Sequence, residues 1–397
     1  MLHLILALLS TQQEVPAPVF ADTVLPLPAP TGRHSVGTTT AYLVDSTRTD
    51  GNFPGGRPIT VQLWYPALHD ESQASSYLQE PGLPSLLLRI QYYGIDSAAL
   101  GAWPTILTHS RVNPPPDRGP FPLITFSVGL GLIRANYTTL AEELASHGFI
   151  VALVETPLAG TMISQDGREI MDTIGITETP AGHRAAVVTW SRDVRFALDQ
   201  MQLQQLPGES GRVARVIDWG HVGAAGHSSG GLVAIATCEA DERVRACVDL
   251  DGGMASPSQE PMADFVSHGV TKPTLLLRSR PIYGDADFAR RGITRAQWEK
   301  RGEGGKIALD SLIQRSHGNL RVGGVAGTGH MSFTDAPFVM ASTITRFGGM
   351  IIAPNRGLLV ISSAVRAFFD EEFSIRPGAM AEVTQRFSEL TIENSAR

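Results

Sequence analysis

The chain has 397 residues, of which 43% are hydrophobic and 18% are charged. This apolar content supports a large buried core and excludes a disordered chain, a collagen and a small disulfide-rich protein. The formal net charge of −7 comes from 32 basic and 39 acidic residues without any basic block, so nucleic acid is not an expected partner.

The N-terminal residues Met1 to Leu9 are apolar but lack the Lys or Arg of a typical signal sequence, and Val19-Phe20-Ala21 resembles a cleavage site. We expect residues 1–21 to be either a signal peptide of a secreted or periplasmic protein, or the disordered N-terminus of a cytoplasmic one. No apolar run reaches the roughly 18 residues that a transmembrane helix needs.

Two strands with a turn-rich segment between them, Thr38–Asp45 and Ile59–Tyr65, predict an antiparallel pair. From Phe121 onward, short apolar runs alternate with segments of helical spacing, which predicts an α/β fold with a mostly parallel sheet and helices on both faces. The further predicted strands are Leu123–Phe126, Phe149–Val154, His221–Ala225, Val244–Leu250, Thr274–Leu277 and Leu320–Val325, and the helices are Asn136–His147, Ala181–Gln205, Gly230–Cys238 and, as the last, about Gly357–Asp370.

We expect a single domain over residues 22–397 with a core at about residues 31–370. Pro81–Pro116 and Pro281–Ser316 do not fit the alternation. They are either cap-like insertions over the sheet or plain surface excursions. The apolar stretch Ser85–Trp103 is the candidate for part of a ligand pocket.

Cys238 and Cys247 lie nine positions apart, which matches neither a metal-binding pattern nor a disulfide framework. We expect two partly buried free thiols.

The sequence Gly226-His227-Ser228-Ser229-Gly230 matches the nucleophile elbow, a sharp turn between a strand and a helix that lifts a serine hydroxyl above the sheet. An apolar strand runs into it and an apolar helix runs out of it, as the motif requires. Ser228 is therefore the candidate nucleophile, and the alternative is an ordinary helix-capping serine.

A serine nucleophile needs a base, and in this motif's fold the acid and then the histidine follow the serine along the chain. His330 stands in a Gly-rich loop just after the strand Leu320–Val325, where it would lie over the elbow. It is the candidate base. His268 and His317 are more typical of solvated surface histidines.

The candidate acid is Asp251, which ends the strand Val244–Leu250 and precedes two glycines. We expect the Asp249 side chain to point to the opposite face of the strand. Asp285 and Asp287 are the rivals, since they follow the next strand, but they lie several residues into a loop.

An acyl-transfer site also needs two preorganised donors for the oxyanion. The backbone amide of Ser229 follows the nucleophile and is one candidate. The glycine-rich turn after Leu123–Phe126 offers Leu130 as the other, with Val128 and Gly129 as neighbours that could substitute. A turn shaped only for packing is the alternative.

Several motifs together resemble one family, the plasma-type or isoform II platelet-activating factor acetylhydrolases, over roughly Thr31 to Phe369. The resemblance implies an α/β-hydrolase fold, no metal or cofactor, and hydrolysis of short or oxidised acyl esters of glycerophospholipids. It also implies Ser228, Asp251 and His330 as the triad and Leu130 with Ser229 as the oxyanion hole. The motifs are Leu63-Trp64-Tyr65-Pro66, Phe121 to Gly131, Leu144 to Ala152, Gly226 to Gly231, Leu250-Asp251-Gly252 and Gly329-His330.

The chain departs from this family at Val128, where His is usual, and at Thr156-Pro157-Leu158, where a charged run is usual. We expect a neutral rim, so a general carboxylesterase or a polyester- or dienelactone-hydrolase-like esterase is the alternative to a phospholipid enzyme. Amide hydrolysis is a weaker rival, and a catalytically silent binding protein of the same fold is the alternative from another class. The expected partner is a small-molecule or lipid ester, met in solution or in transient contact with a lipid interface.

Overall fold

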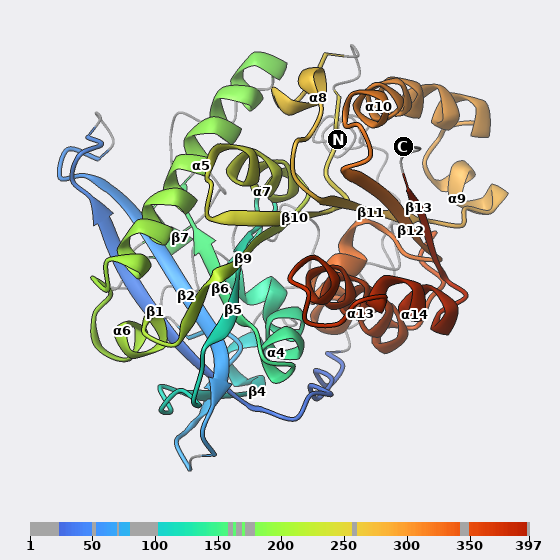
Figure 1. Ribbon diagram of the computed structural model, residues 1–397. Helices are drawn as coiled ribbons and strands as arrows, with labels where there is room; N and C mark the ends of the chain where they lie inside the picture. The colour runs from blue at the N-terminus through green and yellow to red at the C-terminus, as the bar shows by residue number, and fades with distance from the viewer. Residues whose placement is uncertain are drawn as a thin grey trace.

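The computed structural model describes residues 24–49, 53–69, 71–79, 102–157, 162–163, 169–170, 179–255, 260–341 and 349–394 (Figure 1). The predicted signal peptide or disordered N-terminus at residues 1–21 lies outside these ranges, as does all but the end of Ser85–Trp103. Within them, no helix combines the length and the hydropathy needed to span a bilayer.

An eleven-stranded sheet forms the centre of the molecule, in the order β13-β12-β11-β10-β9-β5-β6-β2-β1-β4-β3. Its strands are β1 Ser35–Asp45, β2 Arg57–Ala67, β3 Ala74–Ser76, β4 Leu107–Val112, β5 Phe121–Ser127, β6 Ile150–Glu155, β9 Ile217–His227, β10 Val244–Leu250, β11 Thr274–Arg280, β12 Leu320–Ala326 and β13 Leu390–Asn394. The short strands β7 Met162–Ile163 and β8 Glu169–Ile170 pair separately.

The helices of the described residues cover both faces of this sheet. They are α4 Thr138–Ser146, α5 Pro180–Gln202, α6 Gly208–Ala214, α7 Ser229–Ala240, α8 Phe265–His268, α9 Asp285–Arg290, α10 Arg295–Arg315, α11 Ala336–Val339, α13 Pro354–Glu372 and α14 Ala379–Arg386, with 3-10 turns at η2 Trp103–Thr105, η3 Arg134–Tyr137 and η5 His330–Phe333.

The strands from β6 to β12 run parallel to one another, and antiparallel strands flank them on both sides. The order β6-β5-β9-β10-β11-β12 is parallel at every step. The predicted antiparallel pair is β1 and β2, which joins β6 through β2. The predicted α/β class, the mostly parallel sheet and the helices on both faces are confirmed.

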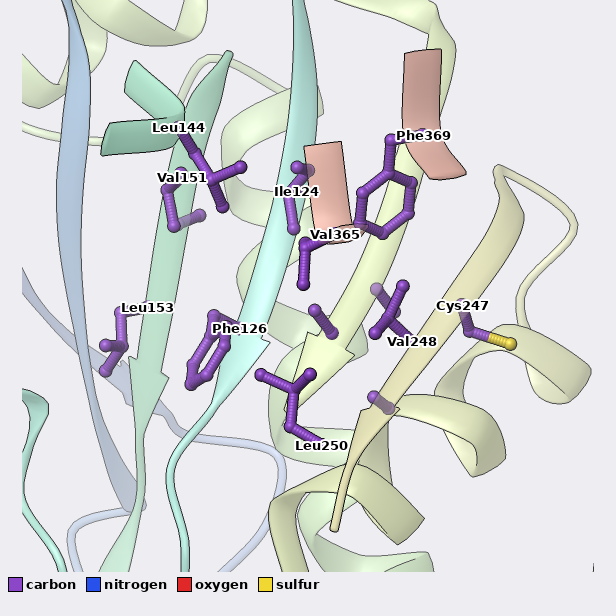
Figure 2. Packing of buried hydrophobic residues seen from close by; sticks show 14 of the residues in the cluster. Ile124, Phe126, Leu144, Val151, Leu153, Cys247, Val248, Leu250, Val365 and Phe369 are labelled. Carbon is purple, nitrogen blue, oxygen red and sulfur yellow. The ribbon is translucent and has the colours of Figure 1, made fainter. Parts of the chain in front are cut away.

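Helices α5 and α7 lie on one face of the sheet, and α4 and α13 lie on the other (Figure 1). Figure 2 shows Val365 and Phe369 pointing from α13 toward Ile124 on β5 and the neighbouring strands. The ring of Phe369 occupies the space in which a side chain at Gly223 of β9 would lie. Phe369 is 0% exposed, and burying a side chain of this size stabilises the fold by about 1.5–3 kcal/mol.

Cys238 of α7 and Cys247 of β10 are free thiols that lie in this core. Both are fully buried rather than partly buried. The reason is that α7 packs on the neighbouring parallel strands, so both side chains lie between the two layers.

The segment Pro281–Ser316 is part of the strand-helix alternation, contrary to the sequence prediction. It contains α9 and α10, and α10 is the crossover between the parallel neighbours β11 and β12. Its sequence lacks a clear apolar stripe, since only Gly304, Ala308 and Leu312 of the helix are buried.

The helix predicted near Gly357–Asp370 is confirmed as α13, but the prediction that it is the last helix was wrong. Helix α14 follows it, and β13 then pairs antiparallel with β12 at the edge of the sheet. The edge position explains why these five residues, which mix apolar and polar types, gave no strand signal.

Candidate active site

The carboxyl ends of the central parallel strands gather the predicted site residues. Ser127 at the end of β5 pairs with Gly226 of β9, and His227 at the end of β9 pairs with Leu250 at the end of β10. The chain passes from β5 to neighbours on opposite sides, which makes this edge a topological switch point, where α/β proteins bind ligands.

Ser228 occupies the turn between β9 and α7 in a strained backbone conformation, with φ 56° and ψ −125°. A positive φ is uncommon for a residue with a side chain and marks functional turns. Its side chain makes no capping hydrogen bond to α7, so the helix-capping alternative does not describe this serine. The backbone amide of Ser228 donates to the carbonyl of Leu250 at 2.9 Å, which fixes the turn against β10.

Two glycines make this turn sterically feasible. A Cβ at Gly226 would collide with the carbonyl of Gly230, and a Cβ at Gly230 would collide with the carbonyls of Ser127 and Val128. The elbow and the turn after β5 therefore pack backbone against backbone, with no room for side chains.

His330 and Asp251 lie in contact, as the sequence analysis expected. Nδ1 of His330 is 2.8 Å from Oδ2 of Asp251. The carboxylate also accepts two hydrogen bonds from Ser279 at the end of β11, from its amide to Oδ1 at 2.9 Å and from its hydroxyl to Oδ2 at 2.9 Å. These bonds leave Nε2 of His330 as the ring nitrogen available to a second group. No hydrogen bond joins Ser228 and His330 in the described structure, and such bonds are often long before substrate binds.

The electrostatic environment keeps Asp251 ionised although it is only 8% exposed. Burial by itself would raise its pKa. The hydrogen bond and charge of His330, the charge of Arg278 and the amide of Ser279 outweigh burial and hold the pKa of Asp251 well below its usual value.

Asp249 lies beneath the elbow rather than beside His330. The expectation of opposite faces was wrong as an alternation argument, because residues two apart in a strand share a face. The two carboxylates separate because the backbone turns after β10, where Asp251 has a positive φ of 59°. The Oδ1 of Asp249 accepts a hydrogen bond from the amide of Gly252 at 2.7 Å, and its Oδ2 has no hydrogen-bond partner in the described structure. Burial raises the pKa of Asp249 to about 6, although the nearby charge of Arg278 opposes the shift.

The rival acids do not reach the histidine. Asp285 is 99% exposed and pairs with Arg295, and Asp287 accepts a hydrogen bond from the amide of Gly284 at the start of α9. His268 and His317, the rival bases, are exposed.

The turn after β5 has three candidate oxyanion amides, of which one is already engaged. The amide of Gly129 donates to the hydroxyl of Tyr137 at 2.8 Å. The amide of Leu130 has no protein acceptor among the described residues, and Leu130 is half-buried. Ser229 begins α7, where first-turn amides lack helical partners, and its hydroxyl lies 3.3 Å from Nε2 of His183.

Three residues near this site were not identified from the sequence: Ser279, Tyr137 and His227. The register of β10 and β11 pairs Leu250 with Leu277, so the residues after both strands lie side by side, which identifies Ser279 once the register is known. Tyr137 precedes α4 without any local motif.

A parallel sheet whose central strand ends in a strained serine turn characterises the α/β-hydrolases, and the chain has this fold. It belongs to the family "Platelet-activating factor acetylhydrolase, isoform II", whose model matches residues 21–166 and 201–378, more than half of the chain.

Curated relatives support this assignment. The platelet-activating factor acetylhydrolase of Cavia porcellus is 29% identical over 258 residues, which cover 58% of this chain and 52% of the relative. The protein of the same name from Gallus gallus is 23% identical over 288 residues, covering 64% and 63%. The chain thus spans less than two thirds of the length of these relatives.

A solved structure is similar over nearly the whole chain. The ferulic acid esterase from Streptomyces cinnamoneus has a TM-score of 0.72 and 28% sequence identity, and the match covers 94% of this chain and 99% of the esterase.

Proposed function

We propose that the protein is a serine ester hydrolase. Ser228 is the nucleophile, His330 the base and Asp251 the group that orients the base, and the amides of Leu130 and Ser229 bind the oxyanion. The observation that carries the proposal is the 2.8 Å contact between Asp251 and His330 beside the strained turn of Ser228.

The chemistry follows from these positions. The Asp251 carboxylate accepts the Nδ1 proton of His330, so Nε2 carries the lone pair that takes the proton of the Ser228 hydroxyl. The serine oxygen then attacks the ester carbonyl, and the resulting oxyanion accepts hydrogen bonds from the two amides, typically worth about 3–4 kcal/mol each. The alcohol leaves with the proton from His330, and water clears the acyl-enzyme by the same steps.

For the substrate, we propose a short acyl ester of a glycerophospholipid. The family match and the relatives named platelet-activating factor acetylhydrolase support this choice. So does the protein from Arthroderma benhamiae named "Probable 1-alkyl-2-acetylglycerophosphocholine esterase", which is 22% identical over 241 residues.

The expectation of a neutral rim rests on Val128 and on Thr156-Pro157-Leu158. Val128, Thr156 and Pro157 are buried, and Leu158 lies outside the described residues, so the neutral rim stays a prediction.

An esterase for ferulic acid esters is the second candidate, because the ferulic acid esterase structure matches almost the full chain. The two candidates share the mechanism and differ in the acyl group.

A substrate panel separates these proposals. We would compare wild type with Ser228→Ala on a 1-alkyl-2-acetyl glycerophosphocholine, on methyl ferulate and on p-nitrophenyl esters of two to twelve carbons. Turnover of the acetyl phospholipid and the short esters, lost in Ser228→Ala, supports the first candidate. A preference for methyl ferulate supports the second, and a folded protein that cleaves none of these esters contradicts both and favours a binding protein.

A further inference from the structure

His227, the residue just before the candidate nucleophile, forms hydrogen bonds through both ring nitrogens. Its Nδ1 lies 2.9 Å from the hydroxyl of Tyr137, and its Nε2 lies 3.0 Å from the backbone carbonyl of His330. The hydroxyl of Tyr137 also accepts the amide of Gly129 at 2.8 Å. His227 and Tyr137 are both fully buried.

These bonds form a hydrogen-bond chain from Gly129 through Tyr137 and His227 to the carbonyl of His330. The chemistry of the groups fixes which atom donates in each bond. The carbonyl of His330 can only accept, so Nε2 of His227 carries the proton. A neutral imidazole has one such proton, and Nδ1 therefore accepts from Tyr137. Burial, with the nearby charge of His330, lowers the pKa of His227 to about 3 and keeps the ring neutral, and burial likewise raises the pKa of the Tyr137 phenol so that it keeps its proton.

This hydrogen-bond chain joins three separate parts of the candidate site. Gly129 belongs to the turn of the oxyanion amide, His227 ends the strand that leads into Ser228, and the carbonyl belongs to the base itself. On the basis of the proposed function, we propose that Tyr137 and His227 are positioning residues, which hold the oxyanion turn, the nucleophile and the base in one fixed arrangement.

Close packing around the hydrogen-bond chain links the position of the oxyanion turn to the positions of His227 and Tyr137. A Cβ at Gly129 would lie 3.1 Å from each of Nδ1 of His227, the hydroxyl of Tyr137 and Cδ1 of Leu132. The turn therefore lies directly against the two side chains, and any shift in them moves the next amide, that of Leu130. The rings of His227 and His330 are 4.5 Å apart.

Both nitrogens of His227 are engaged, so this histidine has no free position from which to exchange a proton with substrate. Its role is geometric, and a displacement of about 1 Å at a reacting group can cost about 100-fold in rate.

The test compares two buried tyrosines. Tyr137→Phe removes the hydroxyl group from this hydrogen-bond chain. Tyr65→Phe is the matched control, because Tyr65 is equally buried and its hydroxyl donates to the carbonyl of Pro114 at 2.7 Å, outside the hydrogen-bond chain. We expect Tyr137→Phe to lower kcat on a p-nitrophenyl ester by about 10- to 100-fold with KM nearly unchanged, and Tyr65→Phe to leave both constants near wild type. A kcat for Tyr137→Phe within twofold of wild type, or an equal fall in both variants, overturns the proposal.

A second measurement does not require activity. Nitrogen-15 spectra of the histidine rings of the wild-type protein should show His227 protonated at Nε2 only, from pH 8 down to pH 5. A ring protonated at Nδ1, or doubly protonated at pH 5, overturns the proposal even if Tyr137→Phe fails to fold. A folded wild type that cleaves no ester instead contradicts the proposed function and with it the catalytic part of this inference. The spectra still decide whether the hydrogen-bond chain through Tyr137 and His227 forms.

Discussion

Asp249 and Asp251 lie two residues apart at the end of β10 and experience opposite electrostatic environments. Both are buried, but Asp251 accepts hydrogen bonds from His330 and Ser279, and these contacts keep its pKa well below the usual value despite burial. Asp249 lies beneath the elbow, where, among the described residues, its Oδ2 accepts no hydrogen bond and has only a 3.8 Å ion pair with Arg278, and burial raises its pKa to about 6. Two carboxylates of one strand thus carry different chemistry.

Asp251→Asn should lower kcat by about 1,000- to 10,000-fold. The amide of Ser279 holds the remaining oxygen at the Oδ1 position, so the new NH₂ group would face Nδ1 of His330 and force the wrong tautomer. Asp249→Asn is the matched control and should change kcat by only a few-fold. Steady-state kinetics on a p-nitrophenyl ester checks this, and equal losses in the two variants would contradict the assigned roles.

Asp249→Asn should also remove a pH-dependent cost in stability. The pKa of Asp249 in the folded protein, about 6, exceeds the ordinary value of 3.8. The free energy of unfolding of wild type is therefore highest below pH 3.8, where the carboxyl is neutral, and it falls as the pH rises through 6 and the buried carboxyl ionises. At pH 8 the variant should therefore be more stable by up to about 3 kcal/mol. Urea unfolding at several pH values measures the difference, which should vanish near pH 4; a difference that is constant with pH would show that burial is not its cause.

Gly230→Ala should damage activity through the backbone. The added Cβ collides with the carbonyls of Ser127 and Val128 and would push the oxyanion turn away from the elbow, so we expect kcat to fall by about 100-fold. Gly253→Ala is the control, since no atom lies within 4 Å of the position that its added Cβ would take. Kinetics of the two purified variants, each checked by circular dichroism, tests the prediction, and normal turnover by Gly230→Ala would refute the close packing of the two turns.

Asp193→Ala should destabilise the fold without changing the site. Asp193 on α5 is fully buried and accepts hydrogen bonds from Arg57 at 2.8 Å and from Arg48 at 2.6 Å. Removing it leaves buried Arg57 without this partner, which should cost about 3–5 kcal/mol. Asp199→Ala on the same helix removes an exposed pair with Arg243 and should cost less than about 1 kcal/mol. Denaturant unfolding distinguishes the two variants. A loss of kcat in folded Asp193→Ala would contradict the prediction that this ion pair contributes to stability alone.

The positions of Ser228, Asp251 and His330 could be predicted from the sequence because each follows a continuous apolar strand. Parallel strands end at the same edge of a sheet, so residues just after them meet there without any knowledge of side-chain packing. The strand-helix alternation located all six central parallel strands for the same reason.

The partners of these residues could not be predicted. Ser279 reaches Asp251 only through the register of β10 against β11, and no local pattern specifies that register. Tyr137 and His227 meet because η3 and the end of β9 come together from distant parts of the sequence, and a tyrosine and a histidine among apolar residues are usually packing residues. The edge strand β13 is too short and too polar to carry a periodic signal.

The site of covalent labelling tests most directly whether Ser228 is the nucleophile. Folded wild-type protein would be treated with a fluorophosphonate, digested and mapped by mass spectrometry, beside Ser228→Ala and Ser229→Ala. We expect one adduct, on Ser228, absent from Ser228→Ala and retained by Ser229→Ala. No adduct on the folded protein, or an adduct on a different serine, would contradict the assignment of Ser228 as the nucleophile.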